Sequence, residues 1–117
     1  MMDELLQGFM TELRRGSLTL AVLGCLKEPH YGYALLETMR EKKLDIEANT
    51  LYPLLRRLES QGLLASDWYT GESRPRKYYV ISERGQLVYG ELLAEWKKLQ
   101  TTITAICRED EPNEQPD

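Results

Sequence analysis

Five basic side chains lie within one short part of the sequence: Arg56, Arg57, Arg74, Arg76 and Lys77. Arginine and lysine neutralise phosphates and release counterions, and arginine can also bond to both acceptors on a guanine edge. Each of these side chains, taken alone, is as easily explained as a solvated surface charge. Five of them within one helix–ribbon unit favour a surface that binds the backbone of a nucleic acid.

The first two arginines lie on a predicted helix that begins near Ala48 or Asn49 and stops at Gly62. Proline is tolerated in the first turn of a helix but disrupts its interior, so Pro53 makes Asn49 the preferred N-cap. The buried face is predicted by leucines at helical spacing: Leu51, Leu54, Leu55 and Leu58. The outward residues are then Asn49, Tyr52, Arg56 and Arg57, and Asn49, Thr50 and Tyr52 lie where a recognition helix first reaches base edges.

The other three bases lie in or beside the loop of a predicted two-stranded ribbon. Segments 63–69 and 77–81 are rich in aromatic and branched residues, and the loop 70–75 contains Gly71 and Pro75. Ahead of the recognition helix, segment 31–43 predicts another helix, and 44–47 is the short turn that joins two helices steeply. This order predicts a winged helix-turn-helix within a mostly helical α+β fold.

Two more helices are predicted near the start of the chain. Apolar residues recur at helical spacing within 3–14: Leu5, Leu6, Phe9, Met10 and Leu13. The run 18–26 is apolar on all sides, and its length and its leucine and alanine content favour a buried helix over a buried strand. Between them, Gly16 and Ser17 either cap a new helix or only bend a continuous one.

A last helix opens at Ser82, a candidate N-cap that is followed by an acid in the first turn. Its apolar residues alternate at spacings of three and four, as in a coiled-coil seam: Tyr89, Leu92, Trp96, Leu99, Ile103 and Ile106. A seam of about two and a half heptads is too short and too apolar to be stable alone in water. The pattern therefore predicts a homodimer. Trp96 is either part of its core or, with Leu92 and Leu99, holds a flat aromatic ligand between the subunits.

The net charge of −4 is located at one end of the chain. Residues 108–117 hold five acids and one base, which leaves residues 1–107 balanced at 14 acids and 14 bases. The acidic total therefore does not exclude a local basic surface. We expect three parts: an N-terminal helix and winged helix-turn-helix at 1–81, a dimerisation helix at 82–107, and a disordered acidic tail at 108–117.

Few residues suit catalysis or metal binding. Cys25 and Cys107 match no metal-binding spacing, and Cys25 lies in an apolar run that predicts a buried small side chain. His30 has no nucleophile partner in a recognisable motif and is more simply a loop residue that caps the next helix. No apolar run approaches the roughly 20 residues that span a bilayer, and the N-terminus lacks the basic start of a signal peptide. We expect a cytoplasmic protein without cofactor, metal or enzymatic activity.

Several short motifs together give the chain a resemblance to a known family. They are Gly16-Ser17-Leu18, His30-Tyr31-Gly32-Tyr33, Thr50-Leu51-Tyr52-Pro53, Arg57-Leu58-Glu59, Arg74-Pro75-Arg76-Lys77-Tyr78-Tyr79 and Ser82-Glu83-Arg84-Gly85. Over residues 14–107 the sequence resembles PadR-family transcriptional regulators of the short subfamily, which have one C-terminal helix. It departs from that pattern at Glu47, where a capping Ser or Asn is usual, and at Ser82, where Thr is common.

The resemblance implies a winged-helix homodimer that binds an operator in double-stranded DNA and represses promoters, in some relatives under the control of a ligand. It implies that region 49–57 enters the major groove and that the wing at 74–77 follows the backbone or the minor groove. The expected DNA-binding residues are Tyr33, Asn49, Thr50, Tyr52, Arg56, Arg57, Arg74, Arg76 and Lys77. The alternative is a winged-helix module that binds another protein and no DNA, which five clustered bases disfavour.

Overall fold

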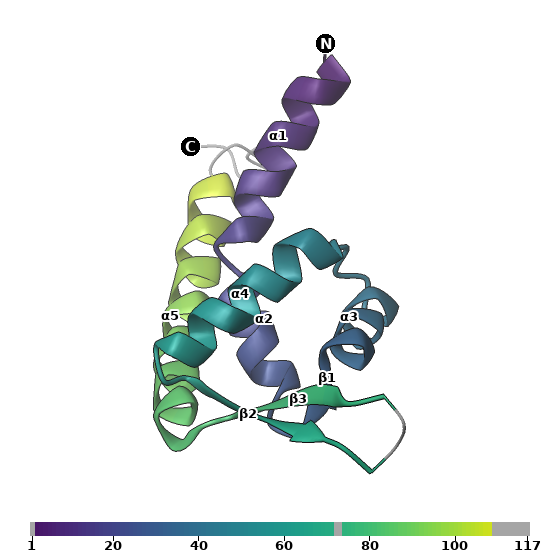
Figure 1. Ribbon diagram of the computed structural model, residues 1–117. Helices are drawn as coiled ribbons and strands as arrows, with labels where there is room; N and C mark the ends of the chain where they lie inside the picture. The colour runs from purple at the N-terminus through teal and green to yellow at the C-terminus, as the bar shows by residue number, and fades with distance from the viewer. Residues whose placement is uncertain (1, 72–73, 109–117) are drawn as a thin grey trace, which may run out of the picture.

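The computed structural model describes residues 2–71 and 74–108, whose arrangement is drawn in Figure 1. The elements are α1 (Met2–Arg15), α2 (Leu18–Cys25), β1 (His30–Tyr31), α3 (Gly32–Glu41), α4 (Ala48–Ser60), β2 (Leu64–Tyr69), β3 (Arg76–Ile81) and α5 (Glu83–Arg108). The predicted α+β architecture, mostly helical with a long C-terminal helix, is confirmed. The expected disordered tail lies outside the described residues except for Arg108, which ends α5.

The core is built from residues at helical spacing on three helices and is closed by the sheet. Its fully buried members are Val22, Leu23, Leu26, Leu35, Met39, Leu51, Leu55 and Leu58. Burial of each such side chain stabilises the fold by about 1.5–3 kcal/mol relative to exposure. The helical prediction for 18–26 and the predicted buried face of α4 are both confirmed.

The sheet is antiparallel with the strand order β1-β3-β2. Strands β2 and β3 pair from Leu64 with Ile81 out to Tyr69 with Arg76. The short strand β1 adds to the other edge of β3, so the ribbon expected to have two strands has a third, and the loop expected at His30 is part of it. A strand of two residues is too short to give an alternating pattern in the sequence. His30 does not cap α3, because its Nδ1 lies 2.9 Å from the carbonyl oxygen of Glu28.

The turn between α3 and α4 begins earlier than predicted, and the N-cap of α4 is a different residue. Helix α3 stops at Glu41, and Lys43 adopts the left-handed φ of 72° that closes this helix end. Helix α4 starts at Ala48 with Glu47 as N-cap, so the predicted N-cap at Asn49 is wrong. The reason is tertiary packing, since buried Ile46 anchors the turn just ahead of the helix.

As a result, Pro53 lies in the second turn of α4 instead of the first. Its ring nitrogen cannot donate to the carbonyl of Asn49, so α4 lacks that one backbone hydrogen bond. Both residues are exposed, so the gap in the ladder faces outward.

The end of α4 and the start of α5 are joined by two caps. Gly62 has φ 81°, which confirms the predicted helix stop, and Leu63 N–H donates to the Leu58 carbonyl at 2.9 Å. The Ser82 hydroxyl accepts from Gly85 N–H at 3.0 Å and donates to the Gly62 carbonyl at 2.7 Å. Ser82 is therefore the N-cap of α5, as predicted, and it also fastens α5 to the end of α4.

Helix α1 and the second half of α5 extend away from the sheet (Figure 1). The helical backbone is interrupted between α1 and α2, so these are two separate helices. Ser17, ahead of α2, makes no side-chain cap bond. Helix α1 has no buried residue. The radius of gyration is 18.2 Å, compared with about 13 Å for a compact chain of this length. In the described part of the chain, no helix combines the length and the apolar character needed to cross a membrane.

Candidate nucleic-acid interface

The outer face of α4 is polar and lies opposite its buried leucines. Asn49, Pro53, Arg56 and Ser60 recur at helical spacing, and all four are exposed. We call these residues the outer ridge of α4. It presents an amide, a guanidinium and a hydroxyl, which are groups that bond to base edges and phosphates. Asn49 and Arg56 thus point outward as predicted.

Tyr52 is half-buried, which corrects the prediction that it points outward. Its ring lies against the start of α3, where a Cβ on Gly32 would be 2.6 Å from Tyr52 Cε1. Any side chain at position 32 would displace the ring, so the glycine permits this close approach. Tyr52 therefore fixes how α4 crosses α3 and holds the first turns of the outer ridge in place.

Tyr33 is 66% exposed in the first turn of α3. Its hydroxyl donates to Glu37 Oε2 at 3.0 Å. This hydrogen bond, together with the negative charge of Glu37, raises the pKa of the Tyr33 phenol. Tyr33 is thus a neutral, exposed hydroxyl at neutral pH, available beside the recognition helix.

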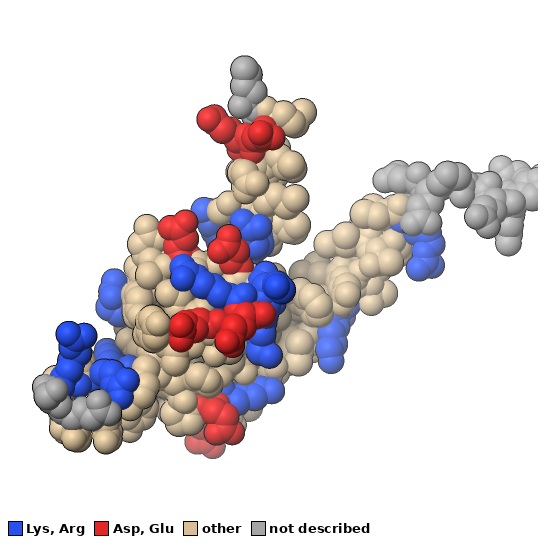
Figure 2. Space-filling model, turned by 90° about the vertical axis from the view of Figure 1, so that its right-hand side faces the viewer, with Lys and Arg blue, Asp and Glu red and all other residues tan. Residues whose placement is uncertain are grey.

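The wing formed by β2 and β3 carries Arg74 and Arg76, both exposed. The Arg76 guanidinium carbon lies 4.4 Å from the centroid of the Tyr31 ring, and Tyr31 meets Tyr78 edge-to-face at 6.2 Å. Figure 2 shows Lys and Arg side chains gathered at the end of the wing, whereas the middle of the same face mixes acids with bases. The positive charge on this face is therefore concentrated at the wing.

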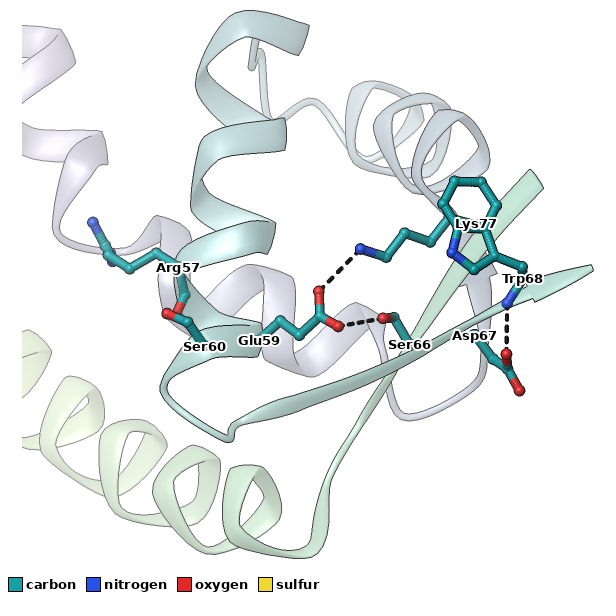
Figure 3. A network of polar contacts seen from close by, with 7 residues as sticks. All are labelled: Arg57, Glu59, Ser60, Ser66, Asp67, Trp68 and Lys77. Carbon is teal, nitrogen blue, oxygen red and sulfur yellow. Dashed lines mark hydrogen bonds and ion pairs between the residues drawn. The ribbon is translucent and has the colours of Figure 1, made fainter. Parts of the chain in front are cut away.

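Lys77 turns back toward α4 (Figure 3). Its Nζ lies 3.1 Å from Glu59 Oε1 and 5.2 Å from the centroid of the Tyr79 ring. The other carboxylate oxygen of Glu59 accepts a hydrogen bond from the Ser66 hydroxyl on β2. The bond from Ser66 and the cation of Lys77 lower the pKa of Glu59 although burial opposes them, and the bond to Glu59 raises the pKa of Lys77.

The five bases therefore do not converge on one spot. Arg56 belongs to the outer ridge, and Arg74 and Arg76 belong to the wing. Figure 3 shows Arg57 pointing away from Lys77, on the other flank of α4. Lys77 is held by the Glu59 carboxylate of α4.

A polar cavity of about 400 Å³ adjoins the start of α4 and brings residues that sequence reasoning missed together with Asn49 and Thr50, which it had named. Its lining includes Arg14 and Arg15 from α1, Asp45 and Glu47 from the turn, and Asn49 and Thr50 from α4. The only signal for the two arginines was their pairing at the end of the first predicted helix. Tyr31, Glu59 and Ser66 were also missed, because their partners come from other elements.

An apolar cavity of about 460 Å³ lies between α5 and the junction of α1 with α2. Its apolar lining is Leu13, Leu20, Leu92, Trp96, Leu99 and Ile103, and Glu95 also borders it. The three candidate ligand residues, Leu92, Trp96 and Leu99, thus meet at one cavity. Tyr89 lies apart, against Gly24 and beneath the Lys27 ammonium, and Ile106 is exposed further along α5.

Comparisons with known proteins identify this arrangement. The Transcriptional regulator PadR-like family matches residues 20–91. A PadR family transcriptional regulator from Eggerthella lenta is 48% identical over 90% of this chain and 94% of its own, with a TM-score of 0.85. A PadR-like transcription factor from Bacteroides fragilis is 36% identical over 85% and 98% of the two chains, with a TM-score of 0.71. A transcriptional regulator from Clostridium thermocellum is 30% identical over 80% and 96%, with a TM-score of 0.75.

No curated protein matches the chain. The family match covers the helix-turn-helix, the wing and the first turns of α5, which are the elements described above as the candidate interface. Members of this family are DNA-binding regulators and not enzymes, so the winged helix of this chain is a DNA-binding domain. The chain belongs to the PadR-like family of transcriptional regulators.

Proposed function

We propose that this regulator is a homodimeric repressor that reads a pseudo-palindromic operator with the outer ridge of α4. The observation that carries this proposal is the pairing of that polar ridge with two exposed wing arginines, in a chain whose residues 1–107 hold equal numbers of acids and bases. Asn49, Thr50 and Arg56 contact base edges, while Arg74 and Arg76 neutralise phosphates. Tyr33, Tyr52 and Arg57 support the flanks of the same surface.

The experiment that tests DNA binding is a gel shift against increasing salt. Duplexes selected from a random library by the protein should bind more tightly than scrambled duplexes, and both affinities should fall as salt rises. A promoter reporter carrying the selected duplex then separates repression from activation. Salt-independent or absent duplex binding would favour the alternative, a winged helix that binds only protein.

The proposed dimer is supported by apolar surface that one chain leaves exposed. Helix α1 exposes Leu5, Leu6, Phe9, Met10 and Leu13, and α5 exposes Trp96, Leu99, Ile103 and Ile106. Apolar patches of this kind mark interaction sites. A twofold dimer would present two α4 helices about 34 Å apart, one turn of DNA, which suits a palindromic site. A monomer in light scattering at micromolar concentration would contradict this.

The proposed inducer is a planar aromatic cation held by Trp96, with Leu92 and Leu99. The apolar cavity beside Trp96, which Glu95 also borders, supports a flat ligand, and the Trp96 ring favours one that is positively charged. Such a ligand would change the spacing of the α5 helices and shift the population away from the DNA-binding form. In Trp68→Phe, Trp96 is the single emitter. Saturable quenching that weakens operator binding and is absent when Trp96 is replaced by Ala supports the site.

A further inference from the structure

The face of the sheet that looks toward α4 changes character along the wing. The register pairs Leu64 with Ile81, Ser66 with Tyr79 and Trp68 with Lys77, so these six side chains share one face. Leu64, Tyr79 and Ile81 are buried, Ser66 and Lys77 are half-buried, and Trp68 is exposed. The hydrophobic core therefore ends at Ser66 and Lys77, where the wing leaves the body.

Glu59 covers this boundary from the recognition helix (Figure 3). One carboxylate oxygen accepts from Ser66 on β2, and the other pairs with Lys77 on β3 at 3.1 Å. A carboxylate that binds both strands restrains the wing against sliding and tilting relative to α4, because each movement would break one bond. We call Glu59, Ser66 and Lys77 the wing clamp.

Lys77 is less exposed than the two wing arginines. Its side chain is 29% exposed, and its ammonium already has a carboxylate and an aromatic ring as partners. If it turned to a DNA phosphate, the Glu59 carboxylate would be left unpaired next to a second negative charge. The geometry therefore favours an internal role for this cation.

We propose that Glu59 is a positioning residue for DNA recognition, fastening both wing strands to α4 and holding Lys77 as a structural cation instead of a phosphate ligand. This inference rests on the proposed DNA-binding function. It assigns Glu59 and Ser66 to recognition without DNA contact, and it moves Lys77 from the binding surface to its support.

The test uses Glu59→Gln, Lys77→Met and the double variant in the full chain, with Glu91→Gln and Lys97→Met on α5 as matched controls. Affinity for the selected and the scrambled duplex is measured by anisotropy over a range of salt. Hydrogen exchange of β2 and β3 reports the clamp independently of DNA. The controls are exposed residues away from α4 and the wing.

We expect Lys77→Met to leave the salt dependence unchanged, because no phosphate contact is lost. Glu59→Gln frees the lysine, so log affinity against log salt should steepen by about 0.9 for each subunit that contacts the scrambled duplex. Both variants should lower the ratio of selected to scrambled affinity roughly fivefold, the effect of one charge-assisted bond at a half-exposed site. The double variant should be no worse than either single variant, and wing exchange should accelerate in all three.

A Lys77→Met variant whose salt slope falls by about 0.9 for each bound subunit would overturn the inference, since Lys77 would then bind phosphate. Unchanged wing exchange in Glu59→Gln would overturn the clamp itself. Duplex binding that is absent in the unmodified protein would instead contradict the proposed function, and the exchange measurement would still decide whether the clamp exists.

Discussion

The root of the wing and the α1–α5 end of the molecule differ in whether their side chains have partners within the chain. At the root of the wing, polar groups from three elements find one another, and Glu59, Ser66 and Lys77 are all bonded within one chain. Along α1 and the second half of α5, large apolar side chains remain exposed, including Trp96 at 41% and Leu99 at 49%. The bonds of the proposed DNA-reading half form within a single chain, whereas the other half has a surface that water solvates poorly.

This difference teaches where specificity and assembly are encoded. The reading half depends on short-range bonds between elements, so point changes there should act at any protein concentration. The α1–α5 half depends on apolar area that a second copy would cover, so changes there should act through association. The following predictions test that division, in order of decreasing effect.

The largest contrast compares the same substitution in the two halves. Leu55→Ala removes a fully buried side chain and should lower the free energy of unfolding by about 2–5 kcal/mol at every protein concentration. Leu99→Ala should lower it mainly through the dimer, so that its urea midpoint rises with protein concentration. Urea midpoints for Leu99→Ala that do not change with protein concentration would contradict the assignment of the α1–α5 half to association.

A charge placed in the apolar face of α5 should prevent association. Ile103→Asp would bury an unpaired carboxylate against a partner, weakening dimerisation by about 3 kcal/mol or more, roughly a hundredfold. Thr102→Asp, on the exposed side away from the cavity, is the matched control. Sedimentation should give a monomer for the first variant and a dimer for the second, and equal behaviour of the two would argue against this interface.

Removing a wing arginine should weaken binding to all DNA sequences by a similar factor. Arg76→Ala is expected to lower affinity about tenfold at moderate salt and to reduce the salt slope by about 0.9 for each bound subunit. Tyr31→Leu keeps the cation but removes the ring beneath it, so affinity should fall less and the slope should persist. Anisotropy titrations with selected and scrambled duplexes measure both quantities. A loss confined to the selected duplex would mean that Arg76 reads bases.

The wing clamp should also appear in the pH dependence of stability. The folded pKa of Glu59 lies below its ordinary value, so its charged form stabilises the fold at neutral pH. That contribution is lost as pH falls through the folded pKa. Glu59→Gln should therefore be less stable by about 1 kcal/mol at most at neutral pH, and the gap should close in acid. Urea unfolding at several pH values measures this gap, and a gap that widens in acid would contradict the sign.

The smallest effect concerns the left-handed residue after α3. Lys43→Gly should stabilise the protein by about 0.5–1 kcal/mol, because glycine adopts the φ of 72° without strain. Lys43→Ala keeps a Cβ and should give no such gain. Thermal unfolding of the two variants decides between relief of strain and a simple loss of charge.

Features with local signals could be predicted from the sequence. The leucine spacing gave the buried face of α4, and Gly62 and Ser82 marked the helix ends, since each depends on its own neighbours in the chain. The N-cap of α4 could not be found in this way, because Ile46 anchors the residues ahead of the helix through the core.

In the candidate site, too, features with a local signal could be predicted, and features that depend on packing between elements could not. Exposure of Asn49 and Arg56 follows from helical spacing alone, and so does the apolar seam of α5. The burial of Tyr52 depends on Gly32 across the interior, and Lys77 finds Glu59 eighteen residues away in the chain. Composition identified these residues as polar or aromatic, but only the packing of separate elements determines their partners.

The strand order also gives the wing the mechanics of a beam fixed at one end. Three strands lie side by side where Tyr78 and Tyr79 pair with β1, and two remain beyond them at Lys77 and Arg76. Because the wing clamp also ties Lys77 to α4, bending stiffness drops beyond Lys77, so a load on the arginines flexes the outermost part first. The load that reaches the three-stranded part of the sheet is shared with β1, which continues directly into Gly32. A pull on the wing is thus transmitted to α3, the helix against which Tyr52 seats the recognition helix.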